Sequence, residues 1–222
     1  MRLPPFRAWA RRIWGLGPSR LALGLAILLA LIAVGSPLWS MAWVSGGNRE
    51  ISSYSWTTVT MDNYLNGNWD GTLILPYTSG FFSFDTVAGV LATAYLLVVV
   101  FILLIIAVAV LFTIERTRRM STLTLLVMSL LVVGVGLLAL LYPIVAIPGA
   151  ATTDVGTFTV AGFWGSTRTT APSRDWSWGA GLGWWLLLIS VVLGIVGAAL
   201  PYLKSIRAMV PPPPEDWQPP AR

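Results

Sequence analysis

The chain has 222 residues, of which 56% are hydrophobic and only 10% are charged, and its formal net charge is +5. This balance is typical of a protein that crosses a membrane several times, and it excludes an ordinary soluble domain. Cysteine and histidine are both absent from the sequence, which excludes disulfides, thiolate metal sites, cysteine nucleophiles and histidine general bases.

Residues 1–20 form a basic segment with five arginines and no acidic residue. Its apolar residues recur at spacings of three and four: Phe6, Trp9, Ile13 and Leu16. This spacing predicts a short amphipathic helix on the membrane surface, and a disordered basic arm is the alternative. Positive charge is expected beside a membrane-spanning segment, so these arginines do not indicate nucleic-acid binding.

Residues 21–44 are predicted to form the first membrane-spanning helix. The densest apolar part ends at Val34, and Gly-Ser-Pro follows at residues 35–37, so a cleaved signal peptide is the alternative. Apolar residues continue beyond that point, which favours an uncleaved helix with Trp39 and Trp43 in the outer membrane interface.

Residues 45–85 form a long polar loop with a strand pattern. The stretches 51–61 and 72–77 are rich in β-branched, aromatic and aliphatic residues, and the turn-rich sequence NGNWDG lies between them at 66–71. This order predicts a β-hairpin or small sheet resting on the outer ends of the helices, to which a strand of the second outer loop could add. Trp56 and Trp69 in this loop are candidate partner-binding residues.

The turn sequence also resembles the start of a calcium loop. Asn66, Asn68 and Asp70 place side-chain oxygens at alternate positions, and glycine is sixth. The twelfth position is Tyr77 where a calcium loop has glutamate, so a plain hairpin turn is the favoured interpretation. No other metal site and no cofactor is predicted.

Two long apolar runs, 86–114 and 121–147, are joined by the charged turn 115–120. Neither run contains an acidic or basic residue, and each exceeds the roughly 20 residues that cross a bilayer core. They are predicted to be the second and third spans.

Residues 148–179 form the second outer loop, in which 156–161 is a strand candidate, and residues 180–203 form the fourth span. Tryptophans crowd the junction between them, and three are further candidate partner-binding residues: Trp164, Trp176 and Trp178. They fit either an interfacial aromatic belt or a face that binds a partner or lipid.

Residues 204–222 form a proline-dense tail. Its candidate docking residues are Pro211, Pro212, Pro213, Pro214 and Trp217. The four prolines predict a polyproline II stretch, which serves either as a docking peptide or as a stiff solvated tail.

Charge predicts the orientation. Eleven of the fourteen basic residues lie in the N-terminal segment, the central turn and the tail, whereas six of the nine acidic residues lie in the two long loops. Positive flanks stay in the cytoplasm, so both termini are placed there and the loops outside the plasma membrane. The expected fold is an all-α membrane protein, a bundle of four transmembrane helices with a small β-rich extracytoplasmic cap.

This layout resembles that of the claudin and peripheral-myelin-protein-like tetraspan group. The shared features are four spans, both ends inside, a long first outer loop with a strand pattern, a tight inner turn and a shorter second loop. In that group a first-loop tryptophan motif is followed by two cysteines, whereas this loop has Trp56 and Trp69 and no cysteine. No functional residue is therefore carried over.

The four predicted spans contain no ionisable Asp, Glu, Lys or Arg, which argues against a proton relay, an ion-coupled carrier or an intramembrane hydrolase. The sequence therefore predicts a non-catalytic accessory or scaffold subunit that contacts other membrane subunits, or its own copies, through its outer loops and tail. The alternatives are an oligomeric channel or transporter component and, third, a lipid-handling enzyme that uses Asp154 and Asp175.

Small residues recur in the last two spans, including Gly134, Gly136, Gly194 and Gly197. They fit close helix packing within the bundle, and a surface for other subunits is the alternative.

Overall fold

The computed structural model describes residues 17–79, 84–114 and 120–209. Most of the basic N-terminal segment, the charged turn between the second and third spans, and the tail with prolines 211–214 and Trp217 lie outside the described residues. The predictions made for those segments therefore stay predictions.

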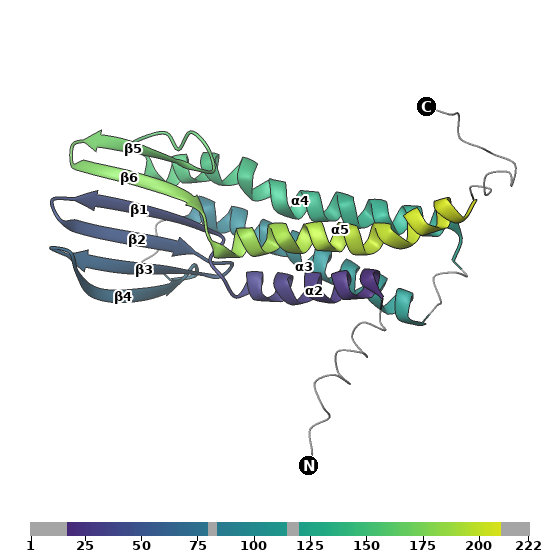
Figure 1. Cartoon of the computed structure of the whole chain (residues 1–222). Helices are drawn as coiled ribbons and strands as arrows, with labels where there is room; N and C mark the ends of the chain where they lie inside the picture. Colours follow the sequence, from purple (N-terminus) through teal and green to yellow (C-terminus); the bar gives the residue numbers. More distant parts are fainter. Residues whose placement is uncertain (1–16, 80–83, 115–119, 210–222) are drawn as a thin grey trace, which may run out of the picture.

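Helices run side by side along the molecule, and a sheet extends from one end of them (Figure 1). The helices are α2 (Pro18–Val34), α3 (Asp85–Ile114), α4 (Thr122–Val155) and α5 (Leu182–Met209). The strands are β1 (Trp39–Ser45), β2 (Asn48–Tyr54), β3 (Thr58–Leu65), β4 (Asn68–Pro76), β5 (Gly165–Thr170) and β6 (Ser173–Ala180). The predicted all-α class is wrong, because the described chain combines these helices with a six-stranded antiparallel sheet.

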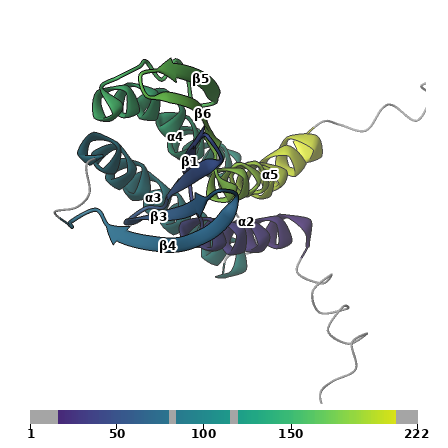
Figure 2. The same cartoon turned by 90° about the vertical axis from the view of Figure 1, so that its left-hand side faces the viewer.

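The two outer loops build one sheet, in the strand order β4-β3-β2-β1-β6-β5. Strand β1 joins the loops, because it pairs with β2 on one side and with β6 on the other. In the second pairing Trp39 lies opposite Ala180 and Trp43 lies opposite Trp176. Figure 2, which looks from the sheet end, shows β5 and β6 beside α4, with β4 at the opposite margin of the sheet.

The predicted first span, 21–44, is wrong in its second half. Helix α2 ends at Val34, and the apolar residues after Pro37 form strand β1. Gly35 caps the helix, and proline then has no N–H with which to continue it. Trp39 and Trp43 therefore belong to the sheet and not to a helical interface belt.

Three described helices, α3, α4 and α5, are long and apolar enough to cross a membrane, which is compatible with the predicted second, third and fourth spans. Helix α2 is also apolar but has only 17 residues. At 1.5 Å per residue it is about 25 Å long, slightly shorter than a bilayer core of about 30 Å. It packs along α5, and the Ser190 hydroxyl donates to the Ala26 carbonyl at 2.7 Å.

The predicted strands of the loops need correction. The stretch 51–61 contains the end of β2, a turn and the start of β3. The predicted first loop thus holds three strands, β2 to β4, where a hairpin or small sheet was expected, and β1 comes from the predicted first span. The candidate strand 156–161 is irregular, because Gly156 adopts a left-handed conformation with φ of 65° at the end of α4. The strands of the second loop follow later, as the hairpin of β5 and β6.

Helix α4 continues to Val155, past the predicted boundary at Ile147, although it contains Pro143 and Pro148. Asp154 explains why the extension is held in place. Its carboxylate accepts hydrogen bonds from the backbone N–H groups of Thr86 and Val87, at 3.2 and 2.8 Å, in the first turn of α3. This contact caps α3 and ties the two helices together beyond the membrane-sized part of the bundle.

Close helix packing accounts for most of the small residues named from the sequence. A Cβ atom on Gly197 would lie 2.7 Å from Leu23 Cγ, and one on Gly136 would lie 3.0 Å from Val191 Cγ1. These contacts place the small residues between α2 and α5 and between α4 and α5. Gly134 differs, because a Cβ there would meet no heavy atom within 4 Å.

Candidate interaction surface outside the bundle

The buried interior of the bundle is chemically inert in the part of the chain that the structure describes. Its buried polar side chains are the serines Ser129 and Ser190, and no acidic or basic side chain is buried among the described residues. The Ser129 hydroxyl is 2.7 Å from the Leu125 carbonyl and 3.0 Å from that of Ala198, so its donor is used within the fold. The described interior of the bundle therefore offers no buried charge.

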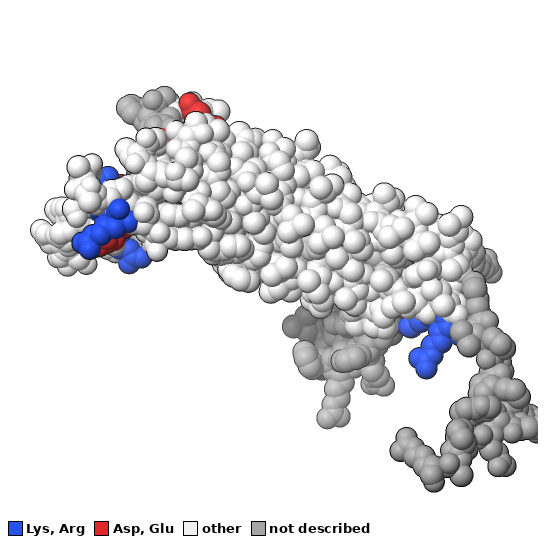
Figure 3. Space-filling view, turned by 90° about the horizontal axis from the view of Figure 1, so that it is seen from above, with Lys and Arg blue, Asp and Glu red and all other residues white. Residues whose placement is uncertain are grey.

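Charged residues gather at the two ends of the described structure, with none on the visible face between them (Figure 3). The end away from the sheet has only basic residues among those described: Arg20, Lys204 and Arg207. The sheet end has both signs: Arg49, Glu50, Asp62, Asp70, Asp85, Asp154, Arg168, Arg174 and Asp175. An uncharged middle between charged ends is the distribution that a bilayer requires.

Two of the tryptophans predicted to bind partners belong to the core. Trp56 is 3% exposed, and its Nε1 donates to the Ala33 carbonyl at 3.1 Å, which fixes the turn after β2 to the end of α2. Trp178 is 8% exposed and donates to the Gly162 carbonyl at 2.8 Å. The Trp56 indole holds the turn after β2 against α2, and the Trp178 indole holds β6 against the segment before β5. Neither offers an open face to a partner.

Trp164 and its neighbours form a cluster where the sheet meets α5. Trp164 is exposed and lies edge-on to Trp184, with ring centroids 5.3 Å apart, and Trp184 lies edge-on to Trp185 at 4.9 Å. Trp185 at the start of α5 is also exposed. Exposed tryptophans at the end of an apolar helix are typical of a membrane interface, so this cluster favours the aromatic-belt interpretation.

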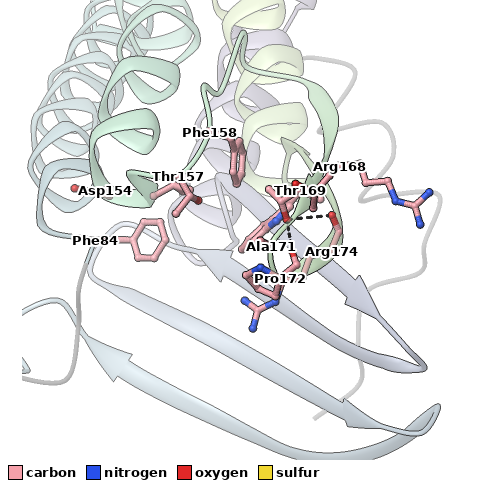
Figure 4. A pocket seen from close by; sticks show the side chains of 12 residues that line it. Phe84, Asp154, Thr157, Phe158, Arg168, Thr169, Ala171, Pro172 and Arg174 are labelled. Carbon is pink, nitrogen blue, oxygen red and sulfur yellow. Dashed lines mark hydrogen bonds between the residues drawn. The ribbon is translucent and has the colours of Figure 1, made fainter.

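A hollow of about 530 Å³ lies between the end of α4 and the turn of the β5–β6 hairpin. Phe158 and Trp176 form part of its wall, with ring centroids 5.2 Å apart. Figure 4 shows Phe158 among the labelled residues of this hollow. The guanidinium carbon of Arg174 is 4.2 Å from the ring centroid of Trp43, within the range of a cation–π contact. Trp43 was not singled out as a binding residue, because its side chain was assigned to a helix.

The two acids of the enzyme alternative serve structural contacts. Asp154 caps α3, and in Figure 4 its carboxylate lies apart from the side chains around Thr169. Asp175 pairs with Arg168, Nε to Oδ1 at 3.2 Å, on the open surface, where both side chains are more than half exposed. Each carboxylate therefore takes part in a separate structural contact.

Two tyrosines of the first loop are shielded from water: Tyr54 is buried and Tyr77 is half-buried. Burial raises the pKa of Tyr54, and the nearby charges of Tyr77 and Glu50 raise it further. Burial also raises the pKa of Tyr77, whose hydroxyl donates to the Ser55 carbonyl. Both phenols therefore stay neutral at physiological pH and serve packing and hydrogen bonding.

Strand β4 is one margin of the sheet and presents apolar side chains there. Trp69, Leu73 and Ile74 are 63%, 49% and 62% exposed. The Tyr77 N–H donates to the Thr57 carbonyl, so the backbone N–H and C=O groups of Tyr77 face the β3 side. Because these groups alternate in direction along a strand, those of Thr72 and Ile74 face away from β3. No described strand pairs with that side.

The residues of the calcium hypothesis lie at the tip of this margin. Asn66 and Gly67 have φ of 49° and 79°, the geometry of a tight two-residue hairpin turn. Asp70 is the extra residue of a bulge, because Asn63 pairs with Gly71 and the next residue of β3 pairs with Trp69. Within the described ranges no three acidic side chains gather as a metal site, and calcium binding by Asn66, Asn68 and Asp70 stays a hypothesis.

Comparison with known protein families finds no family that matches the chain, and comparison with characterised proteins finds no match.

Proposed function

We propose that the protein is a non-catalytic integral membrane protein that serves as an accessory or scaffold subunit and binds partner proteins through its sheet. The observation that carries this proposal is the margin formed by β4, where exposed apolar side chains accompany unpaired backbone groups. Such a margin is a template for pairing with another strand, and isolated natural sheets usually protect it with charge.

The opposite margin of the sheet supports this choice by contrast. Strand β5 has the sequence GSTRTT and carries no aliphatic or aromatic side chain. Strand β4 has the sequence NWDGTLILP, with Leu73 and Ile74 exposed on opposite faces. A partner strand added to β4 gains backbone hydrogen bonds and buries apolar surface on both faces. We therefore assign partner binding to β4, with other membrane subunits or a second copy of the chain as the partner class.

The proposed orientation places both chain ends in the cytoplasm of a cell with this protein in its plasma membrane. It is supported by the basic residues at the end away from the sheet and by the acidic residues at the sheet end. In this orientation α2 crosses the bilayer beside α5. The likeness of the layout to the claudin and peripheral-myelin-protein-like group stays part of the proposal and assigns no residue.

Substitution at the β4 margin is expected to release partners while the fold stays intact. In Ile74→Lys a charged ammonium replaces an exposed side chain on the open margin, where lysine opposes strand addition. We expect partner recovery to fall at least about tenfold, the effect of losing roughly 1.4 kcal/mol of binding free energy. The measurement is gentle-detergent purification of the tagged full chain, with mass spectrometry of the proteins that accompany it.

The matched control is Ser166→Lys, which introduces the same charge at an exposed residue of β5 on the opposite margin. It should leave partner recovery unchanged. Recovery of the wild-type chain as a lone monomer, or equal losses from both variants, would count against the proposal. Solute flux in liposomes that contain only this protein would instead support the oligomeric channel or transporter alternative.

A further inference from the structure

Arg20 has a fixed position at the end of the bundle away from the sheet. It belongs to the first turn of α2, and its Nε donates to the carbonyl of Phe112 in α3 at 3.0 Å. Its Nη2 donates to the same oxygen. The last carbonyls of a helix lack partners within it, so Arg20 caps the C-terminal end of α3. The guanidinium is therefore held in one place beside the helix ends.

The charge of Arg20 lacks a counter-ion in the described structure. The ion pair found among the described residues is that of Arg168 with Asp175, at the other end of the molecule. The Phe112 carbonyl accepts hydrogen bonds from two of the five guanidinium N–H groups of Arg20, and three donors remain. Arg20 is half-buried, and an anion beside it would be attracted to its positive charge.

A hollow of about 250 Å³ opens beside this guanidinium. Lys204 of α5 lines it and brings a second positive charge. Its other lining residues are Gly17, Pro18, Ser19, Phe112 and Pro201. The hollow thus combines two cations with the first turn of α2, whose dipole favours an anion, and with the last turn of α3, where Arg20 covers the Phe112 carbonyl.

The hollow lies at the depth of lipid headgroups. Trp185, in the exposed tryptophan cluster, and Lys204 are about 28 Å apart along α5 at 1.5 Å per residue. That distance matches the thickness of a bilayer core, about 30 Å. When the tryptophans lie at one interface, Arg20 and Lys204 lie at the other.

We propose that this hollow binds the phosphate of an anionic lipid headgroup in the cytoplasmic leaflet. The free N–H donors of Arg20 hydrogen-bond the phosphate oxygens, and Lys204 pairs with the same charge. Basic pockets between membrane helices on the cytoplasmic side recognise lipid headgroups in this way. The inference rests on the membrane crossing and orientation of the proposed function and is independent of partner binding by β4.

The test compares lipid binding by the full-length protein in detergent, using native mass spectrometry with phosphatidylglycerol and phosphatidylcholine of identical chains. The wild type should retain phosphatidylglycerol in preference. Lys204→Gln and Arg20→Gln should each weaken its binding about fivefold, because each removes one basic contact at the headgroup. Lys204 donates no hydrogen bond within the described fold, so its variant remains informative if the Arg20 variant does not fold.

Arg207→Gln is the matched control, because Arg207 lies at the same end of α5 and does not line the hollow. It should change phosphatidylglycerol binding less than twofold. Equal retention of the two lipids, or an equal loss in all three variants, would overturn the proposal. Inorganic phosphate that displaces phosphatidylglycerol at equal concentration would overturn the lipid assignment. Partner recovery with Lys204→Gln should match the wild type, which separates a failure here from a failure at β4.

Discussion

Replacing Gly183 by alanine is expected to destabilise the junction of α5 with the end of α2, at a cost on the order of 3 kcal/mol, the upper range for overpacking. A Cβ on Gly183 would lie 2.7 Å from the Ser36 carbonyl oxygen, 2.9 Å from that of Pro37 and 3.0 Å from that of Ala33. These are backbone atoms and cannot rotate away. The Gly183 N–H also donates to the Pro37 carbonyl at 2.7 Å, so any shift strains that bond.

Gly134→Ala is the matched control, because it makes the same change in a helix at an exposed glycine with no heavy atom within 4 Å. Alanine favours the helix, so this variant should keep or raise stability by up to about 1 kcal/mol. Thermal unfolding of the detergent-purified proteins, followed by tryptophan fluorescence, measures both. Similar midpoints for the two variants would contradict the close approach of α2 and α5 at Gly183.

Replacing Trp39 by alanine is expected to cost about 3 to 5 kcal/mol, the usual loss for a large aromatic residue removed from a core. Trp39 is completely buried, its ring centroid is 5.4 Å from that of Tyr54, and its Nε1 donates to the Phe163 carbonyl at 3.0 Å. The side chain therefore joins the first outer loop to the second. Trp39→Phe should cost less, because it keeps most of the buried ring and loses mainly the Nε1–H donor.

Trp69→Ala serves as the control for that prediction, since Trp69 is 63% exposed at the tip of the sheet. Its stability should stay within about 0.5 kcal/mol of the wild type, as for most surface substitutions. Chemical denaturation monitored by the exposure of the outer loops to protease measures both variants. Equal protection of the loops in Trp39→Ala and the wild type would contradict the role of Trp39 as a link between them.

The sequence predicted the helices most reliably where apolar runs were long. Helices α3 and α4 were recognised because neither run contains a charge over more than a bilayer thickness. Strand β1 was missed because its residues are apolar and directly follow α2, so hydropathy alone merged the two. The mixed class was missed for the same reason. The sequence predicted that a strand of the second loop could add to the first loop's sheet, but not the pairing of β1 with β6, because β1 was assigned to a helix.

The candidate site was only partly predictable. Composition identified the tryptophans, but it did not separate Trp56, which is buried against α2, from Trp69, which is exposed. The structural role of Asp154 could not be predicted, because the N–H groups that it caps, in the first turn of α3, are 67 to 68 residues away in the chain. Asp154 therefore remained a candidate for chemistry. The β4 margin was noted only as an extended stretch, since exposure of Leu73 depends on which strands pair beside it.

The sheet and the bundle have separate physical roles in this account. The bundle buries small and apolar residues and satisfies its few serines internally, as between Ser190 and Ala26. The sheet carries most of the charged residues described, together with the unpaired margin of β4. Binding of partner proteins is therefore expected at the sheet and not between the helices.

Site-specific photo-crosslinking in cells tests that expectation most directly. A photoreactive amino acid at Ile74 on the β4 margin should form adducts with another protein chain, and the same amino acid at Ser166 on the β5 margin should not. A lipid-facing residue of the bundle, Leu138, provides the second comparison. Protein adducts at Leu138 with none at Ile74 would contradict the account, because partners would then meet the helices and not the sheet.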